Sequence, residues 1–589
     1  MLEWKYTVSK VSTSVLKHVA YLLKEQHVDD PSAKFLKSNA AIADLASLEN
    51  YTLARGWLSE CLNKHANCPN SMTSILPTRI IDVLSTADSK VVRLHLADHS
   101  EKGRYVALSY CWGREQPRAT TSTTLNAYTE SINVSDLPKT IQDAIECTRQ
   151  LNIRYLWVDS LCIIQDSERD KIQEIQKMPQ IYSNATVTLS AAAAQHCDEG
   201  FLKLRQDIAL RYSNRSPRLP FRCPDGTQGT MYLVPIAFDW QNSPSKETIY
   251  ERGWTHQERI LSPRLLTYGS RRLSWNCFTL EHCDLGIGHS PRSLTGGDVF
   301  SQTLGGDPLS QTHGDPSTIT LRKLLLVPIL EMNEGGDGGF ASLHHYWRQL
   351  VSRYTIGKCS LAEDKLRALS GIAIRFHQLL HSQYLAGLWK DDLVRDLMWE
   401  SARPLERPAN HYRIPELRSP SWSWASINGE VQYHEACLDK DLYIKATIEE
   451  CTVHVVTDLA PFGEVSGGCL AIRSRLCQMS WTQLKQVFQE RTTLTRAEPP
   501  HESKLGYVYP DENGWLFDWV TELQPENAND QYCLFELARD RKKSYGLIVK
   551  PAGMALFTRV GFYTINSAKP LDHLEIWDQS SVPASIRII

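Results

Sequence analysis

Two groups of polar and aromatic residues in this 589-residue chain have the types that a nucleotide-binding crevice needs. The first group is Ser109, Tyr110, Trp112 and Gly113, and the second is Asp159 and Ser160. A glycine lets backbone approach a phosphate, an aromatic ring stacks on a planar ligand ring, and a carboxylate stabilises a cationic sugar. We expect both groups to line one crevice. The alternative is that Trp112 packs in the core and Asp159 caps a loop or helix.

Three continuous apolar runs must position these groups, at residues 105–113, 155–162 and 185–190. Apolar residues without alternation indicate strands that are buried on both faces, and such strands pair in parallel. A helix expected at residues 136–151 connects the first two runs. Ligands of an open parallel sheet bind outside the carboxyl ends of its strands. The pattern therefore predicts an α/β sheet with both polar groups at one edge.

A second helix is expected between the second and third runs. Its apolar stripe consists of Ile172, Ile175 and Met178, and the helical repeat sets Glu174 off that stripe. Pro179 disfavours helical geometry at the residue before it. We therefore expect this helix to end at Met178.

The composition excludes several classes of protein. The net charge is −3, so we expect no polyanionic partner and no binding to nucleic acid. No run approaches the roughly 18 apolar residues of a membrane span. The 15 cysteines are scattered, and the chain opens into polar sequence without a secretory leader. These features predict a reduced, cytoplasmic protein.

Changes in pattern divide the chain into five expected segments. They are a helical segment at 1–75, an α/β domain at 76–283, a flexible loop region at 284–340, a helical extension at 341–425 and a β-rich domain at 426–589. The first segment includes helical spacing of apolar residues at 11–26. The loop region is rich in Gly, Ser and Thr. The last segment has short alternating runs that are typical of strands.

A short stretch near the start holds three residues that could bind a metal ion, Cys61, His65 and Cys68. A zinc site would need a fourth ligand, for which Cys277 or the pair at 282–283 are candidates. The spacing is not that of a standard zinc finger. Cysteines that pack in the core are the favoured interpretation, so we assign no metal ligands at this point.

Several phrases of the chain, in this order, resemble the fungal heterokaryon-incompatibility (HET) domain family. They are LPTR at 76–79, YVALSYCWG at 105–113, LPKTIQDA at 137–144, LWVDSLCIIQD at 156–166 and IYSNA at 181–185. Two further phrases match sequence that usually follows this domain, RGWTHQER at 252–259 and PSWSWA at 420–425. The resemblance runs from about residue 57 to 430 and assigns residues 76–283 to the HET-like domain.

The HET family is similar to TIR domains, and the resemblance implies their fold and chemistry. The implied fold is a TIR/flavodoxin-like parallel sheet core with surrounding helices, α+β overall once the β-rich C-terminal region is included. The implied activity is death-signalling assembly or cleavage of NAD by a glutamate on a helix. By position, Glu174 is similar to that catalytic glutamate. The chain departs from the family at Lys171, Pro179 and His256.

Three functions remain open on these grounds. The first is a fungal nonself-recognition or programmed cell death protein that self-associates, responds to a protein partner and acts either through assembly or through cleavage of NAD as its substrate; no cofactor is assigned. The second is an enzyme of small-molecule biosynthesis that uses the same crevice. The third is a non-catalytic signalling scaffold. Arg252 could bind a phosphate of the ligand, although a brace between domains is the favoured interpretation of its segment.

Overall fold

The computed structural model divides the chain into two compact units. One comprises Met1–Glu251 and Glu258–Leu326, and the other Arg252–Gln257 and Val327–Ile589. The structure describes residues 20–24, 31, 44–69, 73–85, 88–113, 116, 118–205, 218–235, 247–270, 273–279, 281–283, 338–359, 361, 363–401, 412–413, 419–480, 507–510, 531–566 and 581–589. Each unit is described separately below.

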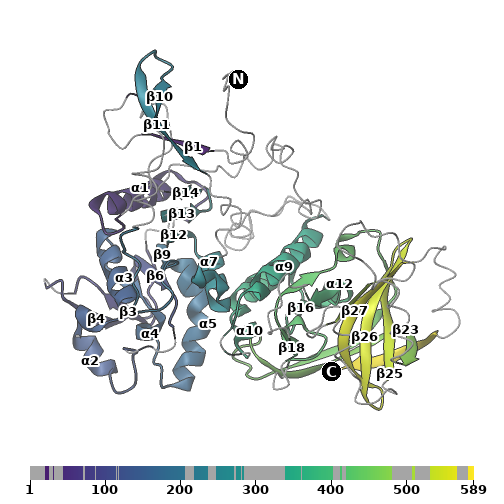
Figure 1. Cartoon of the computed structure of the whole chain (residues 1–589). Helices are drawn as coiled ribbons and strands as arrows, with labels where there is room; N and C mark the ends of the chain where they lie inside the picture. The colour runs from purple at the N-terminus through teal and green to yellow at the C-terminus, as the bar shows by residue number, and fades with distance from the viewer. Residues whose placement is uncertain are drawn as a thin grey trace. The chain divides into compact units, whose positions relative to one another are not determined.

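A nine-stranded sheet forms the centre of the first unit (Figure 1). Its strands, in spatial order, are β14 (Glu281–Cys283), β13 (Leu273–Cys277), β12 (Arg264–Tyr268), β9 (Val187–Ser190), β6 (Tyr105–Ser109), β8 (Tyr155–Trp157), β3 (Arg79–Asp82), β4 (Val91–Leu96) and β7 (Ile132–Asn133). The four in the middle, β12, β9, β6 and β8, pair in parallel. Every residue of these four strands is buried.

The parallel pairing and double-sided burial of the three apolar runs are therefore as predicted. The outer strands on both sides pair antiparallel, which makes the sheet as a whole mixed rather than parallel. In space, the parallel strands follow one another in the order β8, β6, β9 and β12. Numbered by their place in the chain, this order is 2-1-3-4. The chain thus reverses direction across the sheet between β6 and β9.

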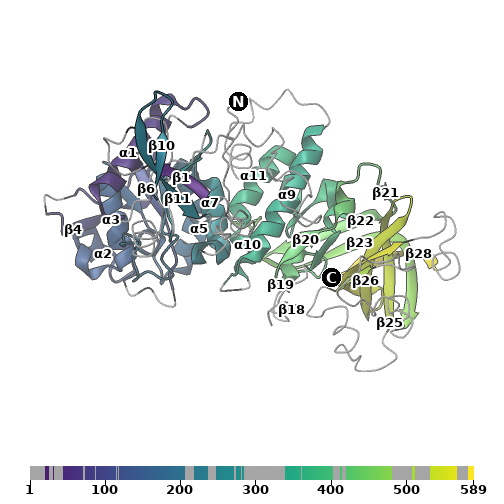
Figure 2. The ribbon, with the colours of Figure 1, turned by 45° about the horizontal axis from the view of Figure 1, so that its top comes forward.

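Helices connect the parallel strands. Helix α3 (Lys139–Gln150) joins β6 to β8, and α4 (Asp159–Cys162) and α5 (Glu168–Asn184) join β8 to β9. Figures 1 and 2 show α3 and α5 on opposite sides of the sheet. Crossovers between parallel strands are right-handed, and the two connections run in opposite directions across the sheet, so their helices must cover opposite faces.

The expected end of α5 at Met178 is wrong, because the helix continues through Pro179 to Asn184. Two tyrosine hydroxyls hold the last turn to the sheet. Tyr182 donates to the carbonyl oxygen of Leu108 at 3.0 Å, and Tyr105 donates to that of Ile181 at 2.6 Å. These buried contacts outweigh the local cost of a proline within a helix.

The expected apolar stripe of α5 is correct only in part, because Met178 is buried as expected, Ile175 is half-buried and Ile172 is exposed. The buried residues are Glu174, Met178, Ile181 and Tyr182. The buried face was misplaced because the last turn, which was not expected to be helical, carries the most strongly anchored side chains. Glu174 consequently lies on the buried face of the helix and not beside it.

The expected N-terminal helix is wrong for the part of it that the structure describes. Residues Ala20–Lys24 form strand β1, which pairs with β11 (Gln228–Pro235), and β11 also pairs with β10 (Arg218–Arg222). A short apolar run does not distinguish helix from strand by its period, and backbone pairing with β11 decides the outcome here. The remainder of residues 11–26 lies outside the described residues. The helix expected near residue 57 is α1 (Leu48–Lys64).

Smaller elements complete the described part of the first unit. They are β2 (Ser74–Ile75), which pairs with β5 (Lys102–Gly103), α2 (Leu125–Glu130), and the 3-10 helices Val134–Asp136 and Thr248–Glu251. Helix α7 (Gly253–Leu261) contains residues of both units. The loop region expected at 284–340 lies outside the described residues as far as Gly338, where helix α9 begins.

The second unit begins with helices and short strand pairs around buried tryptophan side chains, which form its tryptophan core. The helices are α9 (Gly338–Ile356), α10 (Asp364–Arg367), α11 (Ser370–Leu380) and α12 (Leu393–Asp396). The short strand pairs are β15 (Tyr384–Leu385) with β16 (Leu388–Trp389), β17 (Trp399–Ser401) with β20 (Val431–Tyr433), and β18 (Tyr412–Arg413) with β19 (Ile427–Asn428). The carbonyl oxygen of Gly387 accepts hydrogen bonds from the indoles of Trp347 and Trp424, at 3.0 and 2.9 Å.

The C-terminal region is rich in β-structure, as predicted. Its strands are β21 (Tyr443–Ile444), β22 (Thr447–Val455), β23 (Val465–Ser480), β24 (Tyr507–Pro510), β25 (Gln531–Arg539), β26 (Lys543–Gly553), β27 (Leu556–Asn566) and β28 (Ser581–Ile588). A pairing of β23 with β25 closes the sheet on itself. Arg559 of β27 stacks 3.4 Å above the Trp399 ring and donates to the carbonyl oxygen of Leu397, which joins this sheet to the tryptophan core.

None of the helices in the described part of the chain combines the length and apolar character that crossing a membrane requires.

The buried His434 makes the stability of the second unit depend on pH. Burial, with a smaller contribution from Lys543, lowers the pKa of His434 from 6.5 to about 4, and its Nδ1 accepts a hydrogen bond from the backbone N–H of Ala436. Between pH 6.5 and 4 the unfolded chain binds a proton that the folded chain does not. We therefore expect the free energy of unfolding to fall as pH drops through this window, by up to about 3 kcal/mol.

Urea unfolding of the full chain between pH 7.5 and 4 measures this effect. His434→Asn retains an acceptor for Ala436 but does not titrate, so its loss of stability on acidification should be smaller than that of the unaltered protein. The same substitution at the exposed His454 is the control and should leave the pH dependence unchanged. Equal pH dependence in His434→Asn and the unaltered protein would contradict the assignment.

Candidate functional site

The two polar groups predicted to share a crevice meet at the carboxyl ends of β6 and β8. The indole Nε1 of Trp112 donates to Oδ2 of Asp159 at 2.8 Å. One step deeper, the hydroxyl of Tyr110 donates to Oγ of Ser160 at 2.9 Å. These two hydrogen bonds join the segment after β6 to the first turn of α4. The parallel register of Ala107 with Trp157 makes this possible, because it aligns the two strand ends.

Burial separates the residues of this edge into two layers. Ser109, Tyr110 and Ser160 are buried, while Trp112 and Asp159 are half-buried and Gly113 is exposed. Burial, together with the nearby charge of Asp159, raises the pKa of Tyr110 well above its ordinary value, so this phenol stays neutral. A ligand at this edge would meet Trp112 and Asp159 first, and the buried layer would hold those two in place.

Asp159 serves a structural purpose as well. Its Oδ1 accepts from the backbone N–H of Ser160 at 2.7 Å, within the first turn of α4. Together with the indole of Trp112, this hydrogen bond fixes both carboxylate oxygens. The N-cap of α4 is Val158, which makes no side-chain capping hydrogen bond, so Asp159 does not cap this helix and its carboxylate bonds to the adjacent residue.

Gly113 is needed for a reason that the sequence did not reveal. Its φ is +83°, in the left-handed region, and a Cβ added to it would lie 2.7 Å from Cβ of His196. The absent side chain thus makes room for His196, which follows β9. His196 is exposed, and its place next to this edge could be inferred only by extending the rule of strand carboxyl ends to the third strand.

Glu174 is held on the buried face of α5. Its Oε1 accepts from Oγ1 of Thr78 at 3.0 Å and pairs with the Lys177 ammonium at 2.8 Å. The other oxygen, Oε2, is buried without a hydrogen-bond partner among the described residues. A buried carboxylate oxygen that lacks a donor is costly, and such atoms warrant an explanation.

Glu174 and Asp159 lie near the same thiol. Burial raises the pKa of Cys162 to about 12, and the charges of Asp159 and Glu174 both add to the rise. Cys162 is therefore a buried thiol that stays neutral near pH 7. The two carboxylates approach it from different helices, α4 and α5.

Arg79 links helices α4 and α5, a role that the sequence did not predict. Its Nε donates to the carbonyl oxygen of Cys162 at 2.7 Å, and its guanidinium pairs with Asp170 at 2.5 Å. Asp170 also accepts from the backbone N–H of Ile164 at 2.8 Å. The end of α4 and the start of α5 thus share one buried arginine.

The departure from the HET pattern at Lys171 lies one helical turn before Glu174 on α5, and no hydrogen bond or ion pair joins the two among the described residues. Lys171 pairs with the exposed Glu168 at 2.6 Å, one turn earlier on α5. Because Glu174 is on the buried face of the helix, the two residues have different surroundings. The altered residue does not contribute to the contacts of Glu174.

Arg252, predicted as a phosphate ligand, is grouped with the second unit. Its backbone forms a parallel bridge with Lys358, and the nearby indole of Trp254 donates to Asp364 at 3.1 Å. Both contacts lie within the second unit, so the brace between domains that the sequence favours stays a prediction. The role of Arg252 in ligand binding stays a prediction as well.

The comparison with protein families agrees with the sequence phrases. Residues 105–258 match the family described as heterokaryon incompatibility protein (HET). This segment is HET-like. The HET-like segment contains β6, β8 and β9 with the edge described above. No curated protein and no solved structure matches the chain.

Substitution of Gly113 tests how tightly this edge is packed. In Gly113→Ala the left-handed backbone costs about 1–2 kcal/mol, and the contact with His196 adds roughly 1–3 kcal/mol more. Gly226→Ala is the matched control, since Gly226 has a φ of +85° but nothing within 4 Å of the added Cβ. Differential scanning calorimetry should show the larger loss for Gly113→Ala. Equal losses would show that His196 does not occupy the space beside Gly113.

Proposed function

We propose that this chain is a HET-type protein of nonself recognition or programmed cell death, and that its first unit binds NAD at the carboxyl edge of the parallel strands and cleaves it. The match to the HET family supports the biological class. The observation that carries the ligand proposal is the hydrogen bond from Trp112 to Asp159. It orients an aromatic ring and a carboxylate side by side, and both are half-buried at the edge where such sheets bind ligands.

The strand order supports a flavodoxin-like core as part of this proposal. The order β8, β6, β9 and β12 corresponds to 2-1-3-4 in chain sequence, as in flavodoxin-like sheets that bind their ligand where the order reverses. That point lies between β6 and β9, from which the segments bearing Trp112 and His196 extend. A TIR-like core would likewise need buried parallel strands and a ligand at their carboxyl ends.

The proposed reaction breaks the bond between C1′ of the ribose and the nicotinamide nitrogen. The bonding electron pair leaves with nicotinamide, a cationic sugar forms, and water adds to C1′ and loses a proton. A carboxylate near C1′ stabilises the cation. We assign this role to Glu174, whose Oε2 has no hydrogen-bond partner among the described residues, and we expect the half-buried Trp112 ring to stack on the nicotinamide or the adenine.

The same contacts also favour a second candidate, a signalling scaffold without catalysis. The ion pair of Glu174 with Lys177 and the hydrogen bond from Thr78 occupy its other oxygen, as in a purely structural side chain. In that case function would depend on self-association and on a protein partner that triggers it. The two candidates differ in whether Glu174 is needed for chemistry or only for packing.

Release of nicotinamide from NAD by the purified full chain, assayed at high concentration to promote assembly, separates the candidates. We expect release, and we expect Glu174→Gln to reduce its rate by about 100-fold or more. Glu168→Gln, on the exposed side of the same helix, is the matched control and should retain full activity. Circular dichroism and thermal unfolding establish that each variant is folded.

Each outcome identifies one candidate. Absence of nicotinamide release from the assembled protein would remove the hydrolase proposal and leave the scaffold. Release that survives Glu174→Gln would reject that residue as the catalyst while retaining the activity. If Glu174→Gln fails to fold, Asp159→Asn tests the same edge, because loss of the Asp159 charge should weaken cleavage without disturbing the contacts of α5.

A further inference from the structure

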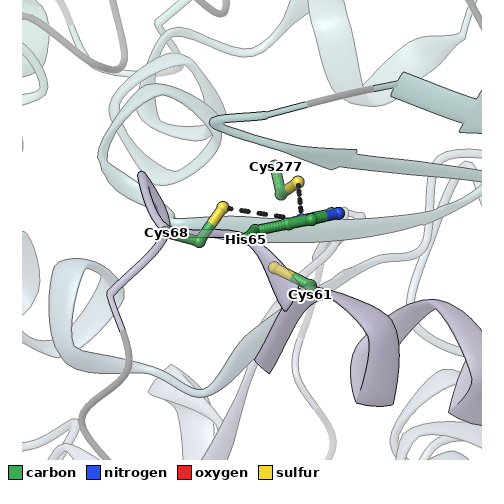
Figure 3. A group of neighbouring side chains, drawn as sticks. All are labelled: Cys61, His65, Cys68 and Cys277. Atoms are coloured by element: carbon green, nitrogen blue, oxygen red, sulfur yellow. Dashed lines mark hydrogen bonds between the residues drawn. The ribbon is translucent and has the colours of Figure 1, made fainter. Parts of the chain in front are cut away.

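We propose that Cys61, His65, Cys68 and Cys277 bind a zinc ion that fastens helix α1 to the sheet of the first unit. The sequence brings three of these residues close together, and the structure adds Cys277 from the end of β13. Figure 3 shows the sulfur atoms of Cys68 and Cys277 directed at the His65 ring from two sides, with Cys61 nearby. The four potential ligand atoms all lie within 4.8 Å of one another.

The spacing of these atoms suits tetrahedral coordination. Zinc binds sulfur at about 2.3 Å and nitrogen at about 2.0 Å, so the ligand atoms of a tetrahedral site lie about 3.5–3.8 Å apart. Nδ1 of His65 is 3.4 Å from Sγ of Cys277 and 3.9 Å from Sγ of Cys68. A single nitrogen thus faces two sulfurs at the separations that a shared metal ion would impose.

The chemistry of the set matches a structural zinc site. Three thiols and one imidazole are the Cys3His combination found in closed zinc sites, which use four protein ligands and keep no open position. All four residues are buried, and none of the three cysteines forms a disulfide with another described residue. In the hydrogen bonds of the described residues, Nδ1 of the buried His65 contacts only sulfur atoms. Packing alone does not explain this arrangement.

A neighbouring arginine balances the charge of the proposed site. Zinc with three thiolates carries a net charge of −1, and Nε of Arg264 donates to Sγ of Cys61 at 3.1 Å. Arg264 lies directly opposite Cys277 in the pairing of β12 with β13. The hydroxyl of Thr279 lies 3.4 Å from Sγ of Cys68. Such outer contacts orient metal ligands and stabilise their charged form.

A second cluster of potential ligands lacks these properties. His344, Asp392 and Asp396 also lie close together, but the guanidinium of Arg348 pairs with both aspartates. A cation already occupies the centre of that group. The cysteine cluster has its arginine outside, against one sulfur, where it assists a metal ion and does not replace it.

The position of the cluster indicates a structural purpose. Arg264 and Cys277 lie at the amino end of the parallel strand β12, whereas Trp112 and Asp159 follow the carboxyl ends of β6 and β8. Figure 1 shows α1 and α4 at opposite ends of these strands. A zinc ion here would join residues 212 positions apart in sequence and hold α1 on the sheet without touching the proposed ligand crevice.

Metal analysis of the full-length protein tests the site. Protein purified without added metal should contain about one zinc ion per chain, measured by mass spectrometry of the digested sample. Cys277→Ala should lose this zinc, and Cys147→Ala, at another buried cysteine of the same unit, should retain it. His65→Cys supplies a fourth thiolate and should also retain zinc, which distinguishes ligation from general packing.

A second measurement keeps the test independent of variant folding. Protein produced with cobalt in place of zinc should show the intense absorption of tetrahedral cobalt and its charge-transfer bands from thiolate. Zinc that persists in a folded Cys277→Ala variant would overturn the proposal. So would unaltered protein that contains no metal and takes up neither zinc nor cobalt. Neither result would bear on NAD cleavage, which depends on the opposite edge.

Discussion

Parallel pairing of β6 with its two neighbours is the constraint on which the first unit depends. It buries β6 completely and aligns Ala107 with both Trp157 and Thr188, so that three strands end at one edge. Every feature of the proposed ligand site follows from that alignment. Trp112 reaches Asp159 because β6 and β8 end together, and His196 reaches Gly113 because β9 ends beside them. A shift in this register would separate all four residues.

The two ends of the parallel strands have different proposed roles in the first unit. The carboxyl end carries half-buried polar groups that fixed neighbours orient, which is the arrangement that binding and catalysis require. The amino end carries a buried cluster of three thiols and an imidazole, which with the proposed zinc ion would form a closed structural site. Arg79 and Arg264 have corresponding roles at the two ends: each uses its guanidinium to tie segments distant in sequence to one another.

The sequence predicted those elements that depend on local patterns. It did not predict the features that depend on tertiary contacts. Continuous apolarity identified β6, β8 and β9, and residues that end those strands proved to be neighbours. The end and the buried face of α5 were not predicted, because Tyr105 and Tyr182 anchor the turn beyond Pro179 and no local rule contains that information. Strand β1 required a partner more than 200 residues away. Cys277 could be suggested as a fourth ligand but not selected, because only the pairing of β13 brings it to α1.

We propose that the carboxyl edge of the parallel strands is the ligand site. Hydrogen–deuterium exchange of the full chain, read by mass spectrometry with and without NAD, tests it most directly. We expect NAD to slow exchange in the peptides that span residues 110–113 and 158–165 and to leave exchange in the peptides of α1 and β13 unchanged. Protection confined to other peptides, or no protection at saturating NAD, would contradict it.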